Sequence, residues 1–343
     1  MYDPDKDERL DPRARAFLAL LPGSSQLPDV STRDEVLAEA NSEEGRAITA
    51  MMLELSKHLD DETLAPKTGL RFTDYTLASV PDGNTVNLQF VRPDTDEVVG
   101  CVYYIHGGGM ASMSCYFGNY QTWARLLARE GVAVALIDFR NCVSPSSVPE
   151  VAPYPAGLND CASGLAWIHE HATELGIDPS RVVVAGESGG GNLTLALGLR
   201  LLREGRLDLV KGLYALAPYI AGLWPQERFP STVDNNGIFI NVHGNRGRMG
   251  YGIAAYDAQD PLAWPGLAGD DDVKGLVPTV IVVNECDPLR DEGVDFYRLL
   301  LRNGVAARCR ESKGTIHANE LIPSVCPDVT LEAVRDLAAF CRG

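Results

Sequence analysis

One segment constrains the fold of this chain more than any other: a strand-like run that ends in a serine between glycines. Residues 181–192 read Arg-Val-Val-Val-Ala-Gly-Glu-Ser-Gly-Gly-Gly-Asn, and a helix-forming stretch follows at residues 193–203. A G-x-S-x-G motif between a strand and a helix is typical of a nucleophile elbow, and Gly186 and Gly190 let the two elements pass close together. We therefore predict that Ser188 stands at the amino end of a helix, where the helix dipole favours negative charge. The alternative is a glycine-rich turn that a serine merely caps.

A second strand-like run, residues 99–105, ends in His106-Gly107-Gly108-Gly109-Met110. Successive glycines leave backbone N–H groups free to point at a ligand oxygen, so we expect Gly108, Gly109 and Gly189 to donate to an oxyanion. A phosphate-binding loop is a weaker alternative, because the Lys-Ser/Thr of a P-loop and the G-x-G-x-x-G spacing are both missing. We expect His106 to organise the turn rather than to act as a base.

A serine hydroxyl becomes a good nucleophile only when a base takes its proton. Two histidines follow Ser188 in the chain, His243 and His317. His317 follows a short strand-like run, residues 306–311, and precedes the last helical segment, so its imidazole can reach the elbow. His243 lies in an irregular Asn/Gly-rich stretch and is the less favoured alternative. We predict that His317 is the base.

The base needs an acidic group that orients it. Asp287 comes directly after the strand-like residues 278–284 and before Pro288, which makes it the best-placed candidate. Asp291 and Glu292 come later and fit the first turn of the next helix, where its dipole favours carboxylates. They remain the alternatives to Asp287.

Three motifs and the late histidine together resemble the hormone-sensitive lipase family of α/β-hydrolases. The motifs are H-G-G-G-M at residues 106–110, G-E-S-G-G-G-N at residues 186–192 and D-P-L-R-D-E-G at residues 287–293. The resemblance covers about residues 70–343. It implies an α/β-hydrolase fold, with a mostly parallel central sheet flanked by helices and a helical cap. It also implies carboxylic ester hydrolysis through a Ser-His-Asp triad and an acyl-enzyme, with no cofactor and no metal.

This chain departs from the family pattern at three places without losing a catalytic group. Ala318 follows the late histidine where relatives usually carry glycine, so the local turn can differ. Glu187 precedes the serine where many relatives have Asp or Thr, which can alter the hydrogen bonding behind the elbow. Residues 141–153 lack a recognisable Leu-Ala-Pro-Glu-type segment.

The order of motifs predicts one α/β body in two parts, residues 67–217 and 278–343, and a cap in two parts. Strand-like and helical patterns alternate from residue 99 onward, with a helix expected at residues 156–175, which favours a mostly parallel sheet. Residues 73–78 and 85–91 should form an antiparallel edge. Residues 1–66 are expected to supply N-terminal cap helices, including one at residues 44–58, and residues 218–277 interrupt the alternation as a cap insertion.

Apolar side chains in the cap segments have two expected roles. Aromatic residues are frequent in residues 218–277, and over a catalytic serine they would form a pocket that excludes water. Met110, Phe239 and Tyr251 are our candidates for lining it. A stripe in the helix at residues 44–58 is instead expected to be ordinary packing; it consists of Ile48, Met51, Met52 and Leu55.

Charge and composition narrow the class of partner. Acidic residues outnumber basic ones, 47 to 30, and the net charge is −17. This balance disfavours nucleic acid and anionic membrane surfaces as partners. The resemblance implies a small-molecule ester as the partner. No signal-like leader and no membrane-spanning run is visible, so we expect a cytoplasmic protein. The eight scattered cysteines predict buried free thiols, and the resemblance implies that the chain can form a homodimer.

These features predict a serine carboxylesterase for short-chain, aryl or bulky esters, lactones included. An amidase or peptidase with the same triad remains an alternative, because the residues do not specify the leaving group. A non-catalytic ligand-binding relative is the other alternative, although the presence of His317 argues against it.

Overall fold

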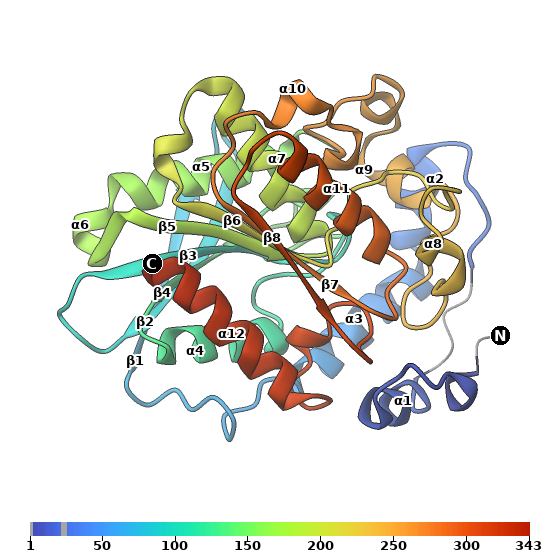
Figure 1. Ribbon diagram of the computed structural model, residues 1–343, viewed down its shortest axis with the longest axis horizontal. Coiled ribbons are helices and arrows are strands. Elements are labelled where there is room, and N and C mark those ends of the chain that lie inside the picture. The colour runs from blue at the N-terminus through green and yellow to red at the C-terminus, as the bar shows by residue number, and fades with distance from the viewer. Residues whose placement is uncertain (1–2, 22–25) are drawn as a thin grey trace.

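The computed structural model describes residues 3–21 and 26–343, and one eight-stranded sheet forms its centre (Figure 1). The strands lie in the order β1-β2-β4-β3-β5-β6-β7-β8. β2 runs antiparallel to both neighbours, and all other pairs are parallel, so the predicted mostly parallel sheet with an antiparallel edge is confirmed. The bounds are β1 Leu70–Ala78, β2 Thr85–Pro93, β3 Val99–Ile105, β4 Ala133–Asp138, β5 Ile177–Glu187, β6 Gly212–Leu216, β7 Thr279–Asn284 and β8 Ala307–Ser312.

Helices cover both faces of the sheet (Figure 1). α4 and α12 pack on one face, and α5, α7 and α11 pack on the other. Successive side chains of a strand point to opposite faces, so Tyr103 joins one core and Tyr104 joins the other. The bounds are α4 Gly118–Arg129, α5 Ala156–Glu170, α6 Ala172–Leu175, α7 Gly189–Glu204, α11 Arg290–Arg302 and α12 Pro327–Arg342, with short 3₁₀ turns η2 Leu207–Leu209 and η4 Asn319–Leu321.

The segment before β1 forms η1 Pro4–Lys6, α1 Pro12–Leu18, α2 Arg33–Ala40 and α3 Glu43–Lys57. Leu10 and Ala14 are buried in a small cluster with Cys286 and Ile316. Those two residues are the sequence neighbours of Asp287 and His317. The start of the chain therefore packs beside the loops that carry the predicted acid and base.

Residues 218–277, between β6 and β7, form α8 Ser231–Asp234, α9 Arg246–Asp257, η3 Pro265–Leu267 and α10 Asp270–Val273. Arg246 at the start of α9 makes two hydrogen bonds to the Glu39 carboxylate of α2, at 2.6 and 2.9 Å. Asn245 adds hydrogen bonds to both backbone groups of Val30. The two segments that were predicted to form a cap thus contact each other.

The helix expected over residues 156–175 is instead two helices, α5 and α6. The backbone leaves helical geometry at His171, where φ is −103° and ψ is 12°. The His171 ring stacks on Trp167 at a centroid distance of 4.1 Å, and its Nδ1 donates to the Trp167 carbonyl oxygen. The Trp167 carbonyl also accepts from the His171 backbone N–H, so His171 closes the last turn of α5.

The expectation that the apolar stripe of α3 packs against the body is also wrong. Ile48, Met51, Met52 and Leu55 are each about half exposed, between 48% and 53%. The chain just after α3 is held firmly, because Asp60 pairs with the buried Arg125 and Thr122 bonds to the backbone at residues 59 and 61. Among the described residues, none holds the middle of the helix in a comparable way.

The eight cysteines are free, and seven of them are buried, which confirms the expectation for all but Cys309. Across residues 3–21 and 26–343, no helix combines the length and the apolar character needed to cross a bilayer.

The buried ion pair between Arg140 and Asp160 is predicted to contribute to the stability of the fold. Arg140 donates from Nε, Nη2 and its backbone N–H to the Asp160 carboxylate, each at 2.9 Å. Asp160→Ala would leave the buried Arg140 guanidinium with Asp82 as its remaining acidic partner. Because a buried charge loses its main partner, the unfolding free energy measured by urea titration should fall by about 3 kcal/mol. The control Asp271→Ala breaks an exposed contact with Lys274 and should leave the midpoint unchanged. Equal midpoints for the two variants would contradict this prediction.

Candidate active site

Ser188 occupies the junction between β5 and α7 in a left-handed backbone conformation, with φ 56° and ψ −118°. Such a conformation costs a non-glycine residue roughly 1–3 kcal/mol and persists only when its surroundings hold it. Here the Ser188 N–H donates to the Leu216 carbonyl at 2.9 Å, and the Ser188 carbonyl accepts from Asn192 and Tyr219. A Cβ on Gly190 would overlap the Ile105 carbonyl oxygen. The glycine is therefore required for β3 and α7 to approach this closely.

The glycines after β3 lie against the elbow. Gly108 and Gly109 have φ of 91° and 63°, a region that glycine adopts without strain. A Cβ on Gly189 would lie 2.8 Å from the Gly109 nitrogen and 2.5 Å from the Met110 nitrogen. In the part of the chain that the structure describes, the N–H groups of Gly108 and Gly109 make no hydrogen bond. The predicted oxyanion donors are thus close together, and two of them are available to a ligand.

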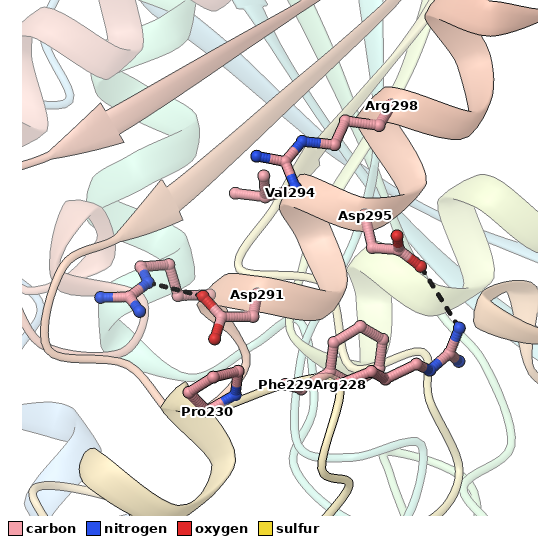
Figure 2. A pocket seen from close by; sticks show the side chains of 8 residues that line it. Arg228, Phe229, Pro230, Asp291, Val294, Asp295 and Arg298 are labelled. Carbon is pink, nitrogen blue, oxygen red and sulfur yellow. Dashed lines mark hydrogen bonds and ion pairs between the residues drawn. The ribbon is translucent and has the colours of Figure 1, made fainter.

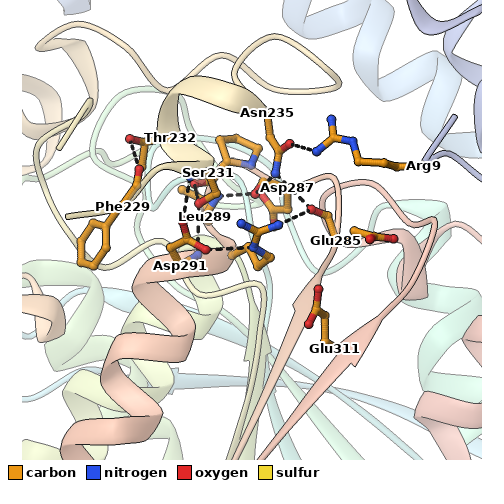
Figure 3. Close-up of polar contacts among 12 residues, drawn as sticks. Arg9, Phe229, Ser231, Thr232, Asn235, Glu285, Asp287, Leu289, Asp291 and Glu311 are labelled. Atoms are coloured by element: carbon orange, nitrogen blue, oxygen red, sulfur yellow. Dashed lines mark hydrogen bonds and ion pairs between the residues drawn. The ribbon is translucent and has the colours of Figure 1, made fainter. Parts of the chain in front are cut away.

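The predicted acid and base are paired. His317 Nδ1 lies 2.8 Å from Asp287 Oδ2, and the two residues are 5% and 0% exposed. The other carboxylate oxygen, Oδ1, accepts from the Leu289 N–H. Figure 3 shows how Asn235 of the residue 218–277 insertion donates to the carbonyls of Asp287 and Glu285, while Arg9 donates to Asn235. The loop that carries Asp287 is therefore linked by hydrogen bonds to both segments that were predicted to form a cap.

Ser188 Oγ and His317 share no hydrogen bond among the described residues. The loops that carry them nevertheless leave the sheet on the same side, at the carboxyl ends of the strands, because β5, β7 and β8 are parallel. In hydrolases without substrate, such a contact often forms only when substrate binds. Ala318, directly after the histidine, has a left-handed backbone with φ 51° and ψ 35°. This conformation costs alanine roughly 1–2 kcal/mol.

The alternative bases and acids have other partners. His243 Nε2 donates to the Thr232 carbonyl at 2.7 Å. Asp291 accepts from the Ser231 N–H and from Arg290. Glu292 is buried and accepts from the backbone N–H groups of Ile220 and Ala221 and from the Trp224 indole. Among these acids, only Asp287 contacts His317.

His106 has the surroundings of a structural residue. It is completely buried, it stacks on Phe139 at 4.3 Å, and its Nδ1 donates to the Gly107 carbonyl. Burial lowers the pKa of its imidazole, so the ring is neutral at physiological pH.

The three candidate pocket residues lie in different surroundings. Met110 is 1% exposed and adjoins the oxyanion glycines. Tyr251 packs edge-on against Trp264 at 5.4 Å. Phe239 instead contacts Phe17 of α1 at 6.0 Å. Tyr219 is one of the aromatic residues in the 218–277 segment that were expected near the serine. Its N–H donates to the Ser188 carbonyl, and its ring stacks on Trp224 at 4.4 Å.

A surface cavity of about 340 Å³ lies between α11 and the residues just before α8 (Figure 2). Its lining includes Arg228, Phe229, Asp291, Val294, Asp295 and Arg298. Asp291, the alternative acid, is among these residues, but Ser188, Asp287 and His317 are not.

The α/β-hydrolase fold family matches residues 102–321, well over half of the chain, and the chain belongs to this family. Among solved structures, esterase Est22 with p-nitrophenol is 56% identical, covers 99% of each chain and has a TM-score of 0.96. Brefeldin A esterase, described as a bacterial homologue of human hormone sensitive lipase, is 35% identical, covers 99% of this chain and 95% of its own, and has a TM-score of 0.84. Carboxylesterase NlhH of Mycobacterium tuberculosis is 30% identical over 70% of this chain and 73% of its own length.

The predicted resemblance to the hormone-sensitive lipase family is therefore confirmed. The predicted enzyme class, carboxylic ester hydrolase, is confirmed as well, because these relatives are named esterases.

The Asp287–His317 contact predicts how the pKa of the His317 imidazole responds when the Asp287 charge is removed. Burial alone lowers the pKa of the His317 imidazole, but the Asp287 charge and hydrogen bond outweigh it, and the pKa lies above its usual value. Asp287→Asn removes the charge, so the His317 pKa should fall. NMR titration of the histidine Cε1–H groups, assigned with His317→Gln, would measure this. His106 serves as the internal control and should titrate below its usual pKa in both proteins. An unchanged His317 titration would contradict the pairing.

Proposed function

We propose that this protein is a serine carboxylesterase whose triad is Ser188, His317 and Asp287. The observation that carries the proposal is the buried 2.8 Å contact between His317 Nδ1 and Asp287 Oδ2, at the sheet edge where Ser188 stands on its strained turn. A carboxylate that orients an imidazole supplies the base that a serine hydroxyl needs.

The chemistry follows from this arrangement in two half-reactions. His317 Nε2 accepts the Ser188 proton while Oγ attacks the ester carbonyl carbon, and the N–H groups of Gly108, Gly109 and Gly189 donate to the oxyanion that forms. His317 then gives the proton to the departing alcohol, which leaves an acyl-enzyme. Water, deprotonated by His317, attacks the acyl carbon, and His317 then returns the proton to Ser188 Oγ as the acyl bond breaks, which releases the carboxylic acid and free Ser188. Each step conserves protons without a cofactor or a metal.

We propose aryl esters as the first substrates to test. Est22, the 56% identical relative, has been solved with p-nitrophenol, an aryl alcohol. In this chain Tyr219 contacts the Ser188 carbonyl through its N–H, and its ring packs with Trp224 and Trp264 at 4.4 and 5.6 Å. An aromatic cluster beside the nucleophile favours a flat apolar alcohol group. Short-chain and bulky esters, lactones included, are the other substrates proposed.

We also propose that residues 1–66 and 218–277 form the cap over this site, supported by the hydrogen bonds that join them. Met110, Phe239 and Tyr251 remain our candidates for its pocket. A small-molecule ester as partner, a homodimer and a cytoplasmic location stay predictions.

Removing the nucleophile tests the proposal. Ser188→Ala should lower kcat for p-nitrophenyl acetate by about 10⁶-fold, the scale found for the serine of other triads. The control Ser180→Ala, at an exposed position near the start of β5, should keep the parent rate. An aryl fluorophosphonate should add covalently to the parent chain and fail to add to Ser188→Ala. A parent chain that is neither active nor labelled would point to the non-catalytic ligand-binding alternative.

The leaving group separates an esterase from an amidase. We expect kcat/KM for p-nitrophenyl acetate to exceed that for p-nitroacetanilide, which differs only in the leaving atom, by several orders of magnitude. Comparable values would favour the amidase alternative. A series of acyl lengths and alcohol sizes, lactones included, would then rank the substrate classes.

A further inference from the structure

We propose that Glu187 is a positioning residue for the oxyanion hole, whose carboxylate holds the Gly107–Gly109 loop against the nucleophile elbow. The inference rests on the proposed function, and it gives a role to a side chain that the triad does not use.

The carboxylate of Glu187 is buried, and its hydrogen bonds reach three different elements. Oε1 accepts from the Gly107 N–H at 2.7 Å and from the Tyr120 hydroxyl of α4 at 2.6 Å. Oε2 accepts from the Tyr104 hydroxyl of β3 at 2.7 Å. Glu187 itself ends β5 and is 4% exposed. One carboxylate thus joins the strand before the serine, the strand before the glycines and a helix on the opposite side of the loop.

The contact with Gly107 fixes the residue that precedes the proposed donors. A Cβ at Gly107 would overlap Glu187 Oε1, so the glycine makes room for the carboxylate. The Gly107 N–H is also within 3.0 Å of the Tyr120 hydroxyl oxygen. Because Gly108 and Gly109 follow directly, the position of the Gly107 peptide determines where their N–H groups point. Oxyanion donors act only when they are held in place before the charge develops.

The network has only neutral donors around its carboxylate. Tyr104 and Tyr120 face it from β3 and α4, and the charged or titratable groups that act on the same region are His317 and Glu320. Burial raises the pKa of Glu187 to about 7. Folding therefore favours the protonated form, and ionising this carboxyl between about pH 4.5 and 7 costs stability. The charge of Glu187 in turn raises the pKa of His317. A group that costs stability when ionised, yet bonds to the Gly107 N–H and carries a charge that acts on His317, has the properties of a functional residue.

Two substitutions of Glu187 separate the role of its carboxylate as a hydrogen-bond acceptor from the role of its negative charge. Glu187→Ala removes both, and it should lower kcat for p-nitrophenyl acetate by about 10²-fold with little change in KM, the scale for loss of an oxyanion donor. Glu187→Gln keeps an acceptor for Gly107 and Tyr120, so it should recover at least tenfold of that loss. Without the charge, the acidic limb of its kcat/KM profile should shift to lower pH, and its Tm at pH 8 should equal or exceed that of the parent. A merely structural role would lower Tm in both variants and leave the acidic limb in place.

Neighbouring tyrosines supply a matched pair should Glu187→Ala fail to fold. Tyr104 and Tyr103 are both fully buried on β3, but the Tyr103 hydroxyl donates to the Cys161 carbonyl on the other face. Tyr104→Phe and Tyr120→Phe should each lower kcat several-fold, while Tyr103→Phe should keep the parent kcat. Parent kcat in Tyr104→Phe and Tyr120→Phe, or in a folded Glu187→Ala, would overturn the proposal. Because Ser188→Ala is assayed in parallel, an active Ser188→Ala would instead reject the esterase mechanism itself.

Discussion

The close approach of β3 to the start of α7 is the constraint on which the rest of the site depends. The Ile105 carbonyl lies so near Gly190 that no side chain fits there, and Ser188, two residues earlier, has a positive φ of 56°. The same approach brings the glycines after β3 against Gly189, and α7 begins directly after the serine, so that its dipole points there. Hydrogen bonds to β6 and from Tyr219 hold this backbone conformation in place. The packing of β3 against α7 thus places the proposed nucleophile and the proposed oxyanion donors side by side.

Buried carboxylates outside the proposed triad tie the surrounding loops to this frame. Glu187 accepts from the Gly107 N–H, Glu292 accepts from the backbone at residues 220 and 221, and Glu320 accepts from Asn284, which in turn accepts from the Ala318 N–H next to His317. Burial raises the pKa of each, to about 7 for Glu187 and about 8 for Glu292. Ionisation of each carboxyl therefore lowers the stability of the fold. In return, the hydrogen bonds of these side chains hold backbone segments from distant parts of the chain in fixed positions.

The sequence predicted the features that depend on local chemistry. Runs of β-branched residues marked the central strands, the glycine pattern marked the elbow, and the Asp287 and His317 loops were found from the strands before them. α4 escaped notice because it starts at Gly118 without a side-chain cap, and residues 118–120 have weak helix propensity. Periodicity showed which residues of α3 share a face, but it carries no information on whether anything covers that face. The Glu187 network was invisible for the same reason, since Tyr104 and Tyr120 lie 83 and 67 residues away and read as ordinary core aromatics.

The contact of α1 and the residues just before it with the loops that carry Asp287 and His317 bears on where a tag can be attached. Arg9 donates to Asn235, which holds the Asp287 loop, and the Asp11 N–H donates to the Gly314 carbonyl three residues before His317. In Figure 1, α1 and the carboxyl terminus lie at opposite sides of the molecule. An affinity tag or fusion partner joined ahead of α1 would crowd the loops that carry Asp287 and His317. One joined after Gly343 would project from the far side of the sheet, which makes the carboxyl end the better point for immobilising this enzyme on a surface.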